Sequence, residues 1–326
     1  MEIIATCASN MKRDYLQQLF DATYHGKYNF HDFIAGDISQ CYEKFEVNGR
    51  LIHNPNTKIK AYHVFLNLFL CRYLNVNTDV VFSYRKGFNT YSAVAKHASN
   101  KYFFQTDLID FFQRLNFGLI EQTLLDGREA CPILDLTNHI ERITELVTVD
   151  KKIPRGFATS PLISNACLFE FDNDLASICA NLNLTYTRYS DDIIISSMEK
   201  KEIFGIEEKI QSSLQKHFGN DLTINQSKSK LSSTADRVSL LGMNILPNGK
   251  VSIDSKLRKK IEVHLHFYSS DKEKFLTLVK GDSKAGLEKI SGWVNYASTI
   301  DPFYLDKLRK KYGATVVDMF VHNSAQ

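Results

Sequence analysis

The stretch Tyr189-Ser190-Asp191-Asp192 carries two adjacent carboxylates at what its flanks predict to be the tip of a β-hairpin. The strand-like residues 184–187 precede it, and the apolar run 193–195 follows it. Two carboxylates this close repel each other, so we expect a cation beside them. Because an Asp-Asp pair is expected about once in a chain of this length, its meaning depends on the residues upstream.

A second acidic corner lies in segment 102–112, which begins as an aromatic, β-prone run and ends with Asp107 and Asp110. If a central strand ending at Asp107 lies beside the 184–198 hairpin, its carboxylate meets those of the Asp-Asp pair. Such a cluster would hold two divalent ions roughly 3.5–4 Å apart, which stabilise the attacking and leaving oxygens of a phosphoryl displacement. The alternative is that Asp107 and Asp110 merely end a strand and cap the next helix.

Six blocks of the sequence, in order along the chain, resemble the motifs of reverse transcriptases, specifically the compact bacterial enzymes of retrons and related phage-defence systems. The resemblance extends from about Arg50 to Trp293, and six blocks in family order are far more specific than any one of them. In family terms they are a fingers motif, the first palm motif, the block that supports the incoming nucleotide, the YxDD box, a lysine motif and the primer-grip hairpin. The blocks are Arg50–Pro55 with Ile59-Lys60, Asp107–Phe112, Pro154-Arg155-Gly156 with Ser160-Pro161 and Asn165, Tyr189–Asp192, Asn225 with Lys228-Ser229, and Leu241-Gly242.

This resemblance implies an α+β, right-hand polymerase fold with fingers, a palm built on an antiparallel sheet, and a helical thumb. We expect N-terminal helices and fingers over residues 1–105, a palm over 106–250 with a helical insertion at about 118–150, and a thumb over 251–326. The implied activity is that of an RNA-directed DNA polymerase, a nucleotidyltransferase that uses two metal ions. By the same resemblance it copies a dedicated non-coding RNA and acts in anti-phage defence.

The resemblance also assigns roles to individual residues. Asp107 and Asp191 would hold two Mg²⁺ ions, for which Mn²⁺ is a substitute, and Asp192 would be a weaker or outer ligand. Lys228 would protonate the leaving pyrophosphate, although a lysine in an exposed turn is the simpler interpretation. The implied phosphate contacts are Arg50, as a bidentate clamp on the triphosphate, and Arg85 and Lys86 (with Lys44). Phe112 would be a ring that excludes a ribose 2′-OH, and Arg155 and Gly156 would lie beside the incoming nucleotide. Tyr189 would lie under the primer terminus. Phe112 could equally be a core residue at a helix start.

Three departures from the family pattern limit this transfer. Arg155 stands where most reverse transcriptases have Gln, which adds a charge beside the triphosphate. Segment 93–97 keeps His97 of the retron Asn-Ala-x-x-His block but lacks its Asn, and 240–242 reads Leu-Leu-Gly instead of the retron Val-Thr-Gly. We therefore favour a defence-associated or abortive-infection relative of the retron enzymes over a standard retron member.

The resemblance implies an RNA template or non-coding RNA, a DNA product and deoxynucleotides as partners, together with a partner effector protein or a second copy of the chain. Two competing functions stay open. The first is a template-independent or protein-primed DNA nucleotidyl transferase on the same fold, which Arg155 suggests. The second is a non-catalytic RNA-binding scaffold, which the presence of all three carboxylates argues against.

Composition is compatible with this interpretation. The chain has 326 residues, enough for a sizeable core and two or three subdomains. Its six cysteines (7, 41, 71, 131, 167 and 179) show no metal-ligand spacing, which predicts reduced, buried thiols. Residues 1–4 show no secretion signal, and no segment approaches the ~20 apolar residues of a membrane span. We expect a cytoplasmic protein without a membrane partner.

The net charge of +3 is unevenly distributed. Residues 250–326 contain 14 lysines and arginines against 9 acidic residues, which is +5 and leaves −2 for the rest of the chain. Two clusters, 256–260 and 307–311, lie in helix-prone segments and could present cations to phosphates, although solvated helix faces would look the same.

Local patterns predict several elements. Residues 1–49 look mostly helical, 61–74 reads as an amphipathic helix, and 118–150 reads as two helices broken near Cys131-Pro132. Ser160 is expected to cap a helix that continues to about Ile178, with Pro161 in its first turn. Asn248-Gly249 predicts a two-residue hairpin turn, and three or four helices are expected after residue 254.

Overall fold

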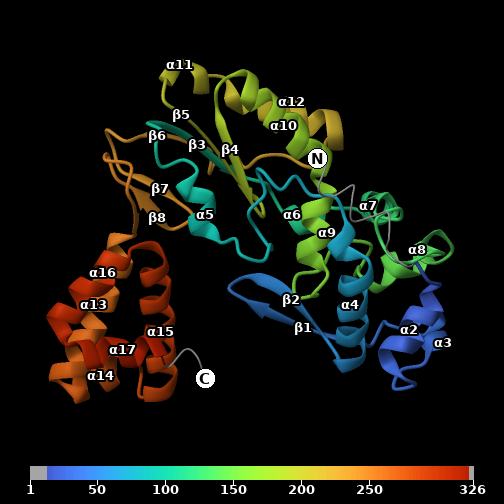
Figure 1. Ribbon diagram of the computed structural model, residues 1–326, viewed down its shortest axis with the longest axis horizontal. Coiled ribbons are helices and arrows are strands. Elements are labelled where there is room, and N and C mark those ends of the chain that lie inside the picture. The colour runs from blue at the N-terminus through green and yellow to red at the C-terminus, as the bar shows by residue number, and fades with distance from the viewer. Residues whose placement is uncertain (1–12, 323–326) are drawn as a thin grey trace. The chain divides into compact units, whose positions relative to one another are not determined.

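The computed structural model describes residues 13–322. The expectation drawn from residues 1–4, and the thiol of Cys7, lie outside this range. The chain mixes helices with three antiparallel or mixed β-sheets (Figure 1), so the α+β class is confirmed. Strands pair in the orders β1-β2, β4-β5-β3-β6 and β7-β8-β9.

The chain divides into two compact units. Unit 1 comprises residues 1–87, 106–193 and 204–229, and unit 2 comprises 88–105, 194–203 and 230–326. These divisions fall inside β3 (Tyr102–Asp107) and β5 (Asp192–Ser197). The three-part division into fingers, palm and thumb stays a prediction.

The other elements of unit 1 are helices around short strands. In chain order they are α2 (Leu16–Tyr24), α3 (Phe30–Ala35), β1 (Tyr42–Val47), β2 (Arg50–Pro55), α4 (Thr57–Phe69), the 3₁₀ turn η1 (Cys71–Tyr73), α6 (Phe111–Arg114), α7 (Phe117–Asp126), α8 (Leu136–Leu146), α9 (Ser160–Cys167), α10 (Phe169–Asn181), β4 (Thr185–Tyr189) and α12 (Ile206–Phe218).

An aromatic cluster forms one part of the core of unit 1. Phe20 of α2 packs against Phe33 of α3 and Phe65 of α4, with ring centroids 5.0 and 5.4 Å away. All three rings are buried, and each contributes about 1.5–3 kcal/mol through burial. Asn56 begins α4 by accepting a hydrogen bond from the Ile59 amide, a common N-cap contact. The ring contacts and the Asn56 N-cap together hold α4 in place directly after the β1-β2 hairpin.

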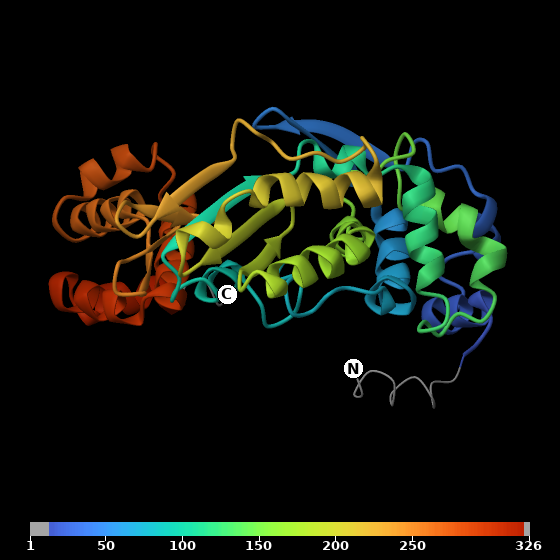
Figure 2. The ribbon, with the colours of Figure 1, turned by 90° about the horizontal axis from the view of Figure 1, so that it is seen from above.

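Helices also cover strand β4 in unit 1. Helix α10 packs against β4, and α12 packs against α10, as Figure 2 shows along one side of the strands. The apolar run after the Asp-Asp pair begins β5 and is fully buried at Ile193, Ile194 and Ile195. A strand buried in this way holds the turn before it at a fixed place.

Unit 2 contains small strands and a helical C-terminal part. Its elements are α5 (Thr90–Ala95), α11 (Lys200–Ile203), β6 (Lys230–Ser233), β7 (Val238–Leu240), β8 (Met243–Ile245), β9 (Val251–Ile253), α13 (Ser255–Ser270), α14 (Lys272–Leu278), α15 (Ser283–Ile300), α16 (Pro302–Tyr312) and α17 (Ala314–His322). Helix α15 packs against both α16 and α17 (Figure 1). Buried Ile290, Val294 and Phe320 belong to the core that joins these helices to β7-β9.

Aspartates begin four of the C-terminal helices of unit 2. The side chains of Asp254, Asp271, Asp282 and Asp301 each accept a main-chain N–H bond at the N-terminus of the following helix. Four of the nine acidic residues in this part of the chain thereby neutralise helix ends. The lysines of 256–260 and 307–311 lie within α13 and α16.

Several local expectations are confirmed. Residues 118–150 contain two helices, α7 and α8, separated across Cys131-Pro132. Residues 241–242 form a tight turn between β7 and β8, with positive φ at both positions. The five cysteines within residues 13–322 are free and buried. No helix in that range is both long and apolar enough to cross a membrane.

Other expectations were wrong in detail. Segment 42–47 is strand β1 instead of helix, because it pairs residue by residue with β2. The helix expected over 61–74 begins at Thr57 and ends at Phe69. Ser160 is the first residue of α9 and not its cap, because its hydroxyl donates to the Pro154 carbonyl at 2.6 Å.

Three further elements differ from expectation. The helix expected to continue to about Ile178 breaks at Leu168 into α9 and α10. The hairpin expected at Asn248-Gly249 is confirmed by the antiparallel pairing of residues 243–245 with 251–253, but its turn closes between Leu246 and Lys250 and so includes Pro247 as well. Residues 255–322 form five helices, where three or four were expected after residue 254.

Candidate active site

The acidic corner forms where β3 ends and β5 begins. These strands are neighbours in the four-stranded sheet, so Asp107 at the end of β3 faces the turn that contains Asp191. The amide of Leu108 donates to the carbonyl of Asp191 at 3.0 Å, and the amide of Asn225 donates to the carbonyl of Asp107 at 2.8 Å. Three segments distant in sequence are therefore joined by main-chain hydrogen bonds at this corner.

The three carboxylates interact electrostatically. Burial, and then repulsion from Asp191 and Asp107, raise the pKa of Asp192 from 3.8 to about 6. Asp107 is balanced differently, because its Oδ2 accepts from Lys228 Nζ at 2.7 Å. That hydrogen bond raises the pKa of Lys228, an exposed residue in the turn before β6, and keeps its side chain protonated.

The corner has donor atoms suited to a hard cation. Asp107 Oδ1 is buried and has no hydrogen-bond partner, which is costly unless a ligand engages it. Carboxylate oxygens are the ligands that Mg²⁺ prefers. Within residues 13–322, however, no three His, Cys, Asp or Glu side chains are already arranged around a common metal position. The donor set fits a divalent ion, while the Lys228 ammonium now engages one of its oxygens.

Asp110 bears on the alternative explanation of this corner. It occupies the position before α6, but its side chain makes no capping hydrogen bond and is exposed. Asp107 does end a strand, yet its buried, unpartnered oxygen is not explained by that role. Helix capping therefore does not account for the two residues.

A glycine and an arginine lie beside the β1-β2 hairpin. The amide of His53 in β2 donates to the carbonyl of Arg155 at 2.8 Å. Gly156 follows with φ +107°, and a Cβ at this position would lie 2.2 Å from the His53 carbonyl oxygen. Only glycine fits here. The Arg155 guanidinium lies over the Phe112 ring, 5.7 Å from its centroid, so two of the expected nucleotide-side residues contact each other.

The remaining expected phosphate contacts differ in how they are engaged. Arg50 begins β2 and is exposed. Arg85 donates through Nη1 to the carbonyls of Thr78 and Val81 at 2.6 and 2.5 Å. Lys86 is exposed, and Lys44 lies 3.8 Å from a carboxylate oxygen of Asp150. Arg85 therefore already supports its own loop.

Tyr189 is the last residue of β4 and is partly buried. Desolvation, and then the nearby Tyr84, raise the pKa of its phenol. The Tyr84 hydroxyl lies 3.1 Å from the Ser190 hydroxyl. The turn is thus contacted from the segment around residue 84.

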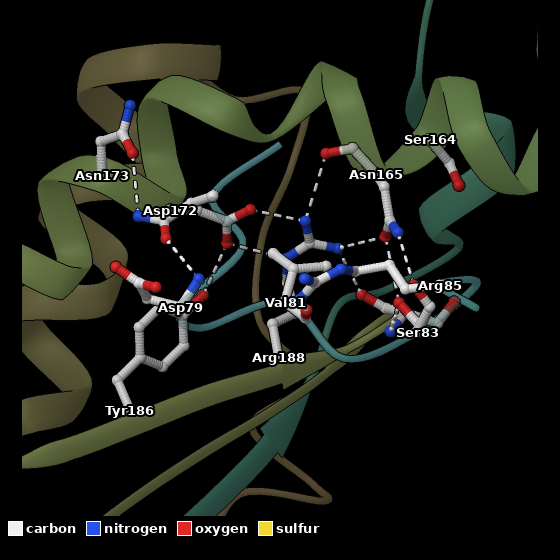
Figure 3. A network of polar contacts seen from close by, with 12 residues as sticks. Asp79, Val81, Ser83, Arg85, Ser164, Asn165, Asp172, Asn173, Tyr186 and Arg188 are labelled. Atoms are coloured by element: carbon white, nitrogen blue, oxygen red, sulfur yellow. Dashed lines mark hydrogen bonds and ion pairs between the residues drawn. The ribbon is translucent and has the colours of Figure 1, made fainter. Parts of the chain in front are cut away.

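Sequence reasoning missed the ion pair behind the turn, which Figure 3 shows. Arg188 of β4 and Asp172 of α10 are both fully buried, with Nη2 and Oδ2 2.5 Å apart. The available signal was a charged residue inside an otherwise uncharged strand, since such a residue is seldom buried without a partner. The identity of the partner could not be read from the sequence.

Comparisons with known proteins identify the family to which this chain belongs. A model of the family described as reverse transcriptase (RNA-dependent DNA polymerase) matches residues 42–245. The retron Ec73 reverse transcriptase of Escherichia coli is 28% identical over 273 residues, which cover 81% of this chain and 83% of that protein. The retron Ec83 reverse transcriptase of Escherichia coli is 24% identical over 280 residues, covering 84% and 86%.

Among solved structures, telomerase from Candida albicans superposes with a TM-score of 0.45 and 11% identity, over 87% of this chain and 60% of that one. A likeness at that score supports no conclusion. The family match and the retron relatives confirm the resemblance seen in the motifs. The chain therefore belongs to the reverse transcriptase family, the RNA-directed DNA polymerases, and is related over most of its length to bacterial retron reverse transcriptases.

Proposed function

We propose that this reverse transcriptase copies a dedicated non-coding RNA into DNA as part of an anti-phage defence system, with its chemistry at the Asp107 corner. The observation that carries the site is the main-chain bond between Leu108 and Asp191, which brings carboxylates from two strands together. The relation to retron enzymes supports the template class. The defence role is carried over from the resemblance to phage-defence enzymes.

We assign metal binding to Asp107, Asp191 and Asp192. Two divalent ions bound there would stabilise charge on the attacking and leaving oxygens of the phosphoryl transfer. Lys228 holds a proton within hydrogen-bond distance of Asp107, where it is positioned to donate to a leaving pyrophosphate. If Asp107 bound a metal ion, the exposed Lys228 side chain would no longer be held by that carboxylate and would be available to donate its proton to the substrate.

Nucleotide contacts are assigned to further residues of unit 1. Arg50 is exposed and has the guanidinium geometry for bidentate phosphate contacts. Phe112, with Arg155 over its ring, would lie under the sugar, and Gly156 keeps the main chain close to β2. Tyr189 would pack under the primer terminus. Arg85, Lys86 and Lys44 are secondary phosphate contacts in this proposal.

The test is to sequence the nucleic acid that co-purifies with the protein, together with the DNA made on adding deoxynucleotides. We expect one discrete RNA and DNA complementary to it. Nuclease treatment that removes the RNA should abolish synthesis. A wild-type protein that is equally active without any RNA would overturn the proposal.

A second candidate is a template-independent or protein-primed DNA nucleotidyl transferase. The observation that favours it is Arg155, a guanidinium on the Phe112 ring where the family usually has an amide. It predicts incorporation of a single deoxynucleotide type after nuclease treatment, or DNA covalently attached to the polypeptide. Denaturing electrophoresis with and without protease distinguishes the two products.

A further inference from the structure

Every N–H donor of the Arg188 guanidinium has a partner. Its Nε and Nη2 donate to Asp172 at 2.8 and 2.5 Å, and Nη1 and Nη2 each donate to Asn165, at 3.2 Å. The fifth bond runs from Nη1 to the main-chain carbonyl of Ser190 at 2.9 Å. An arginine has five such donors, so the side chain is saturated in one orientation (Figure 3).

The charge of this arginine is balanced within the same network. Asp172 Oδ1 also accepts from the Tyr186 hydroxyl at 2.8 Å, so the carboxylate is held from two residues of β4. Both ionic side chains have 0% exposure. A buried ion pair of this kind is weak evidence for stability by itself, since apolar residues often replace one without loss. The role of this ion pair is therefore to hold a neighbouring segment in place.

What it positions is the turn between β4 and β5. Ser190 has φ +59°, a left-handed conformation that non-glycine residues seldom adopt. Arg188 holds its carbonyl, and Ser83 Oγ accepts from its amide at 2.8 Å. Ser83 in turn donates to Asn165 at 3.0 Å. One network therefore holds both peptide groups that flank Ser190, the residue before Asp191.

We propose that Arg188, with Asp172 and Asn165 behind it, is a positioning residue that fixes the Ser190 turn and thereby the placement of Asp191 and Asp192. This inference rests on the proposed function of those carboxylates. Arg188 itself contacts neither substrate nor metal. Its role is to make the carboxylates rigid, as hydrogen-bonded supports of metal ligands commonly do.

The test compares two perturbations of Arg188 with a matched control. Arg188→Lys keeps the charge but lacks the planar set of donors. The double variant Arg188→Met/Asp172→Leu removes both charges and fills the space with apolar atoms. Arg142→Lys is the control, because Arg142 donates to the carbonyls of Phe33 and Gly36 elsewhere in unit 1.

Two readouts are measured for each protein as a function of Mg²⁺ concentration: the rate of deoxynucleotide incorporation and the Tm without nucleotide. We expect Arg188→Lys and the double variant to raise the half-saturating Mg²⁺ concentration about 10- to 100-fold in both assays. The double variant should regain a Tm near wild type in the absence of Mg²⁺ but keep the shifted Mg²⁺ dependence. Arg142→Lys should lower Tm without changing the Mg²⁺ dependence.

A folded double variant with a wild-type Mg²⁺ midpoint overturns the inference, and so does an equal shift in Arg142→Lys. If the double variant does not fold, Ser83→Ala decides the matter, since it removes the acceptor of the Ser190 amide and the donor to Asn165 but leaves both charges of the ion pair in place. An unchanged Mg²⁺ midpoint in Ser83→Ala and Arg188→Lys then counts against it. Failure of the proposed site is distinguishable, because Asp191→Asn/Asp192→Asn would then retain full synthesis whatever Arg188 does.

Discussion

Two ion pairs are connected to the Asp191-Asp192 turn and its carboxylate corner, and they are built differently. Arg188–Asp172 is fully buried, and every donor of its arginine is used. Lys228–Asp107 is open on the lysine side, with 63% of that side chain exposed, and leaves Asp107 Oδ1 without a partner. We infer that the two pairs have different roles. The first pair fixes the turn, whereas in the second the Lys228 ammonium can be replaced at Asp107 by another ligand.

The largest expected effect is a loss of kcat on changing Asp107 of the open Lys228–Asp107 pair. Replacing Asp107 with Asn removes a charge assigned to bind the metal, and such charge stabilisation is worth several kcal/mol. We expect kcat to fall about 10³- to 10⁴-fold, as measured by deoxynucleotide incorporation on co-purified RNA. Asp110→Asn is the matched control, because Asp110 is exposed and makes no capping bond. Equal activity in both variants would place the chemistry elsewhere.

Removing one partner of the buried Arg188–Asp172 pair should also lower the stability of the fold. Asp172→Asn leaves the Arg188 charge buried without a counter-charge, which costs about 3–5 kcal/mol of unfolding free energy. Denaturant unfolding measures this loss. Asp174→Asn on the same helix breaks a partly exposed pair with Lys216 and should cost about 1 kcal/mol or less. Similar losses in the two variants would remove the distinction between buried and open pairs.

Lys228→Met tests whether the open pair contributes to the chemical step. General-acid catalysis contributes at least about 10²-fold, so we expect kcat to fall by that order with little change in folding stability. Lys230→Met, at an exposed position in β6, is the control. A wild-type kcat for Lys228→Met would reduce this lysine to a passive counter-ion.

His63 is a buried titratable group without a counter-charge, and it makes the stability of the fold depend on pH. His63 is fully buried, its Nε2 lies 2.9 Å from the Leu146 carbonyl, and burial lowers its pKa from 6.5 to about 4. Between pH 6.5 and 4 the unfolded chain binds a proton that the folded chain refuses, so stability falls as pH falls through this window. At pH 5 this effect of His63 lowers the free energy of unfolding by about 2 kcal/mol relative to neutral pH.

Denaturant unfolding at pH 7 and pH 5 measures this effect. His63→Gln should lose less stability between the two pH values than wild type, by about 2 kcal/mol. His31→Gln, at an exposed position, should follow wild type. An identical pH dependence in His63→Gln and wild type would contradict the assignment.

The smallest effect is expected at Arg155. A partly exposed cation–π contact is worth about 0.5–1 kcal/mol, which corresponds to a two- to fivefold change. Arg155→Gln should free the Phe112 ring and increase incorporation of ribonucleotides relative to deoxynucleotides by about that factor. Competition between a deoxynucleotide and its ribonucleotide measures it. Arg155→Lys separates loss of the planar group from loss of charge.

Much of this fold could be predicted because local patterns and family motifs pointed to the same elements. The run Ile193–Ile195 and the strand ending at Asp107 were identifiable from their apolar and β-prone residues, and the turn at 241–242 from its resemblance to a family hairpin. Segment 42–47 was not, because its alternation depends on pairing with β2. Tertiary pairing overrides local propensity in such cases.

The site was predictable only in part, for a related reason. Motifs named Asp107, Asp191 and Lys228, which lie together as the main-chain bonds and the 2.7 Å contact describe. They did not indicate Asp172, whose partner lies 16 residues away on another element. Nor did they indicate that Arg85 would be engaged by carbonyls of its own loop. Contacts that form only when the residues are buried together leave no pattern in the local sequence.

The close approach of the His53 carbonyl to Gly156 has a consequence for how this enzyme can diverge. Position 156 is closed to every side chain, because even a methyl group would displace the adjoining hairpin. A substitution at position 155, by contrast, leaves this close approach in place and alters the side-chain contact with the Phe112 ring.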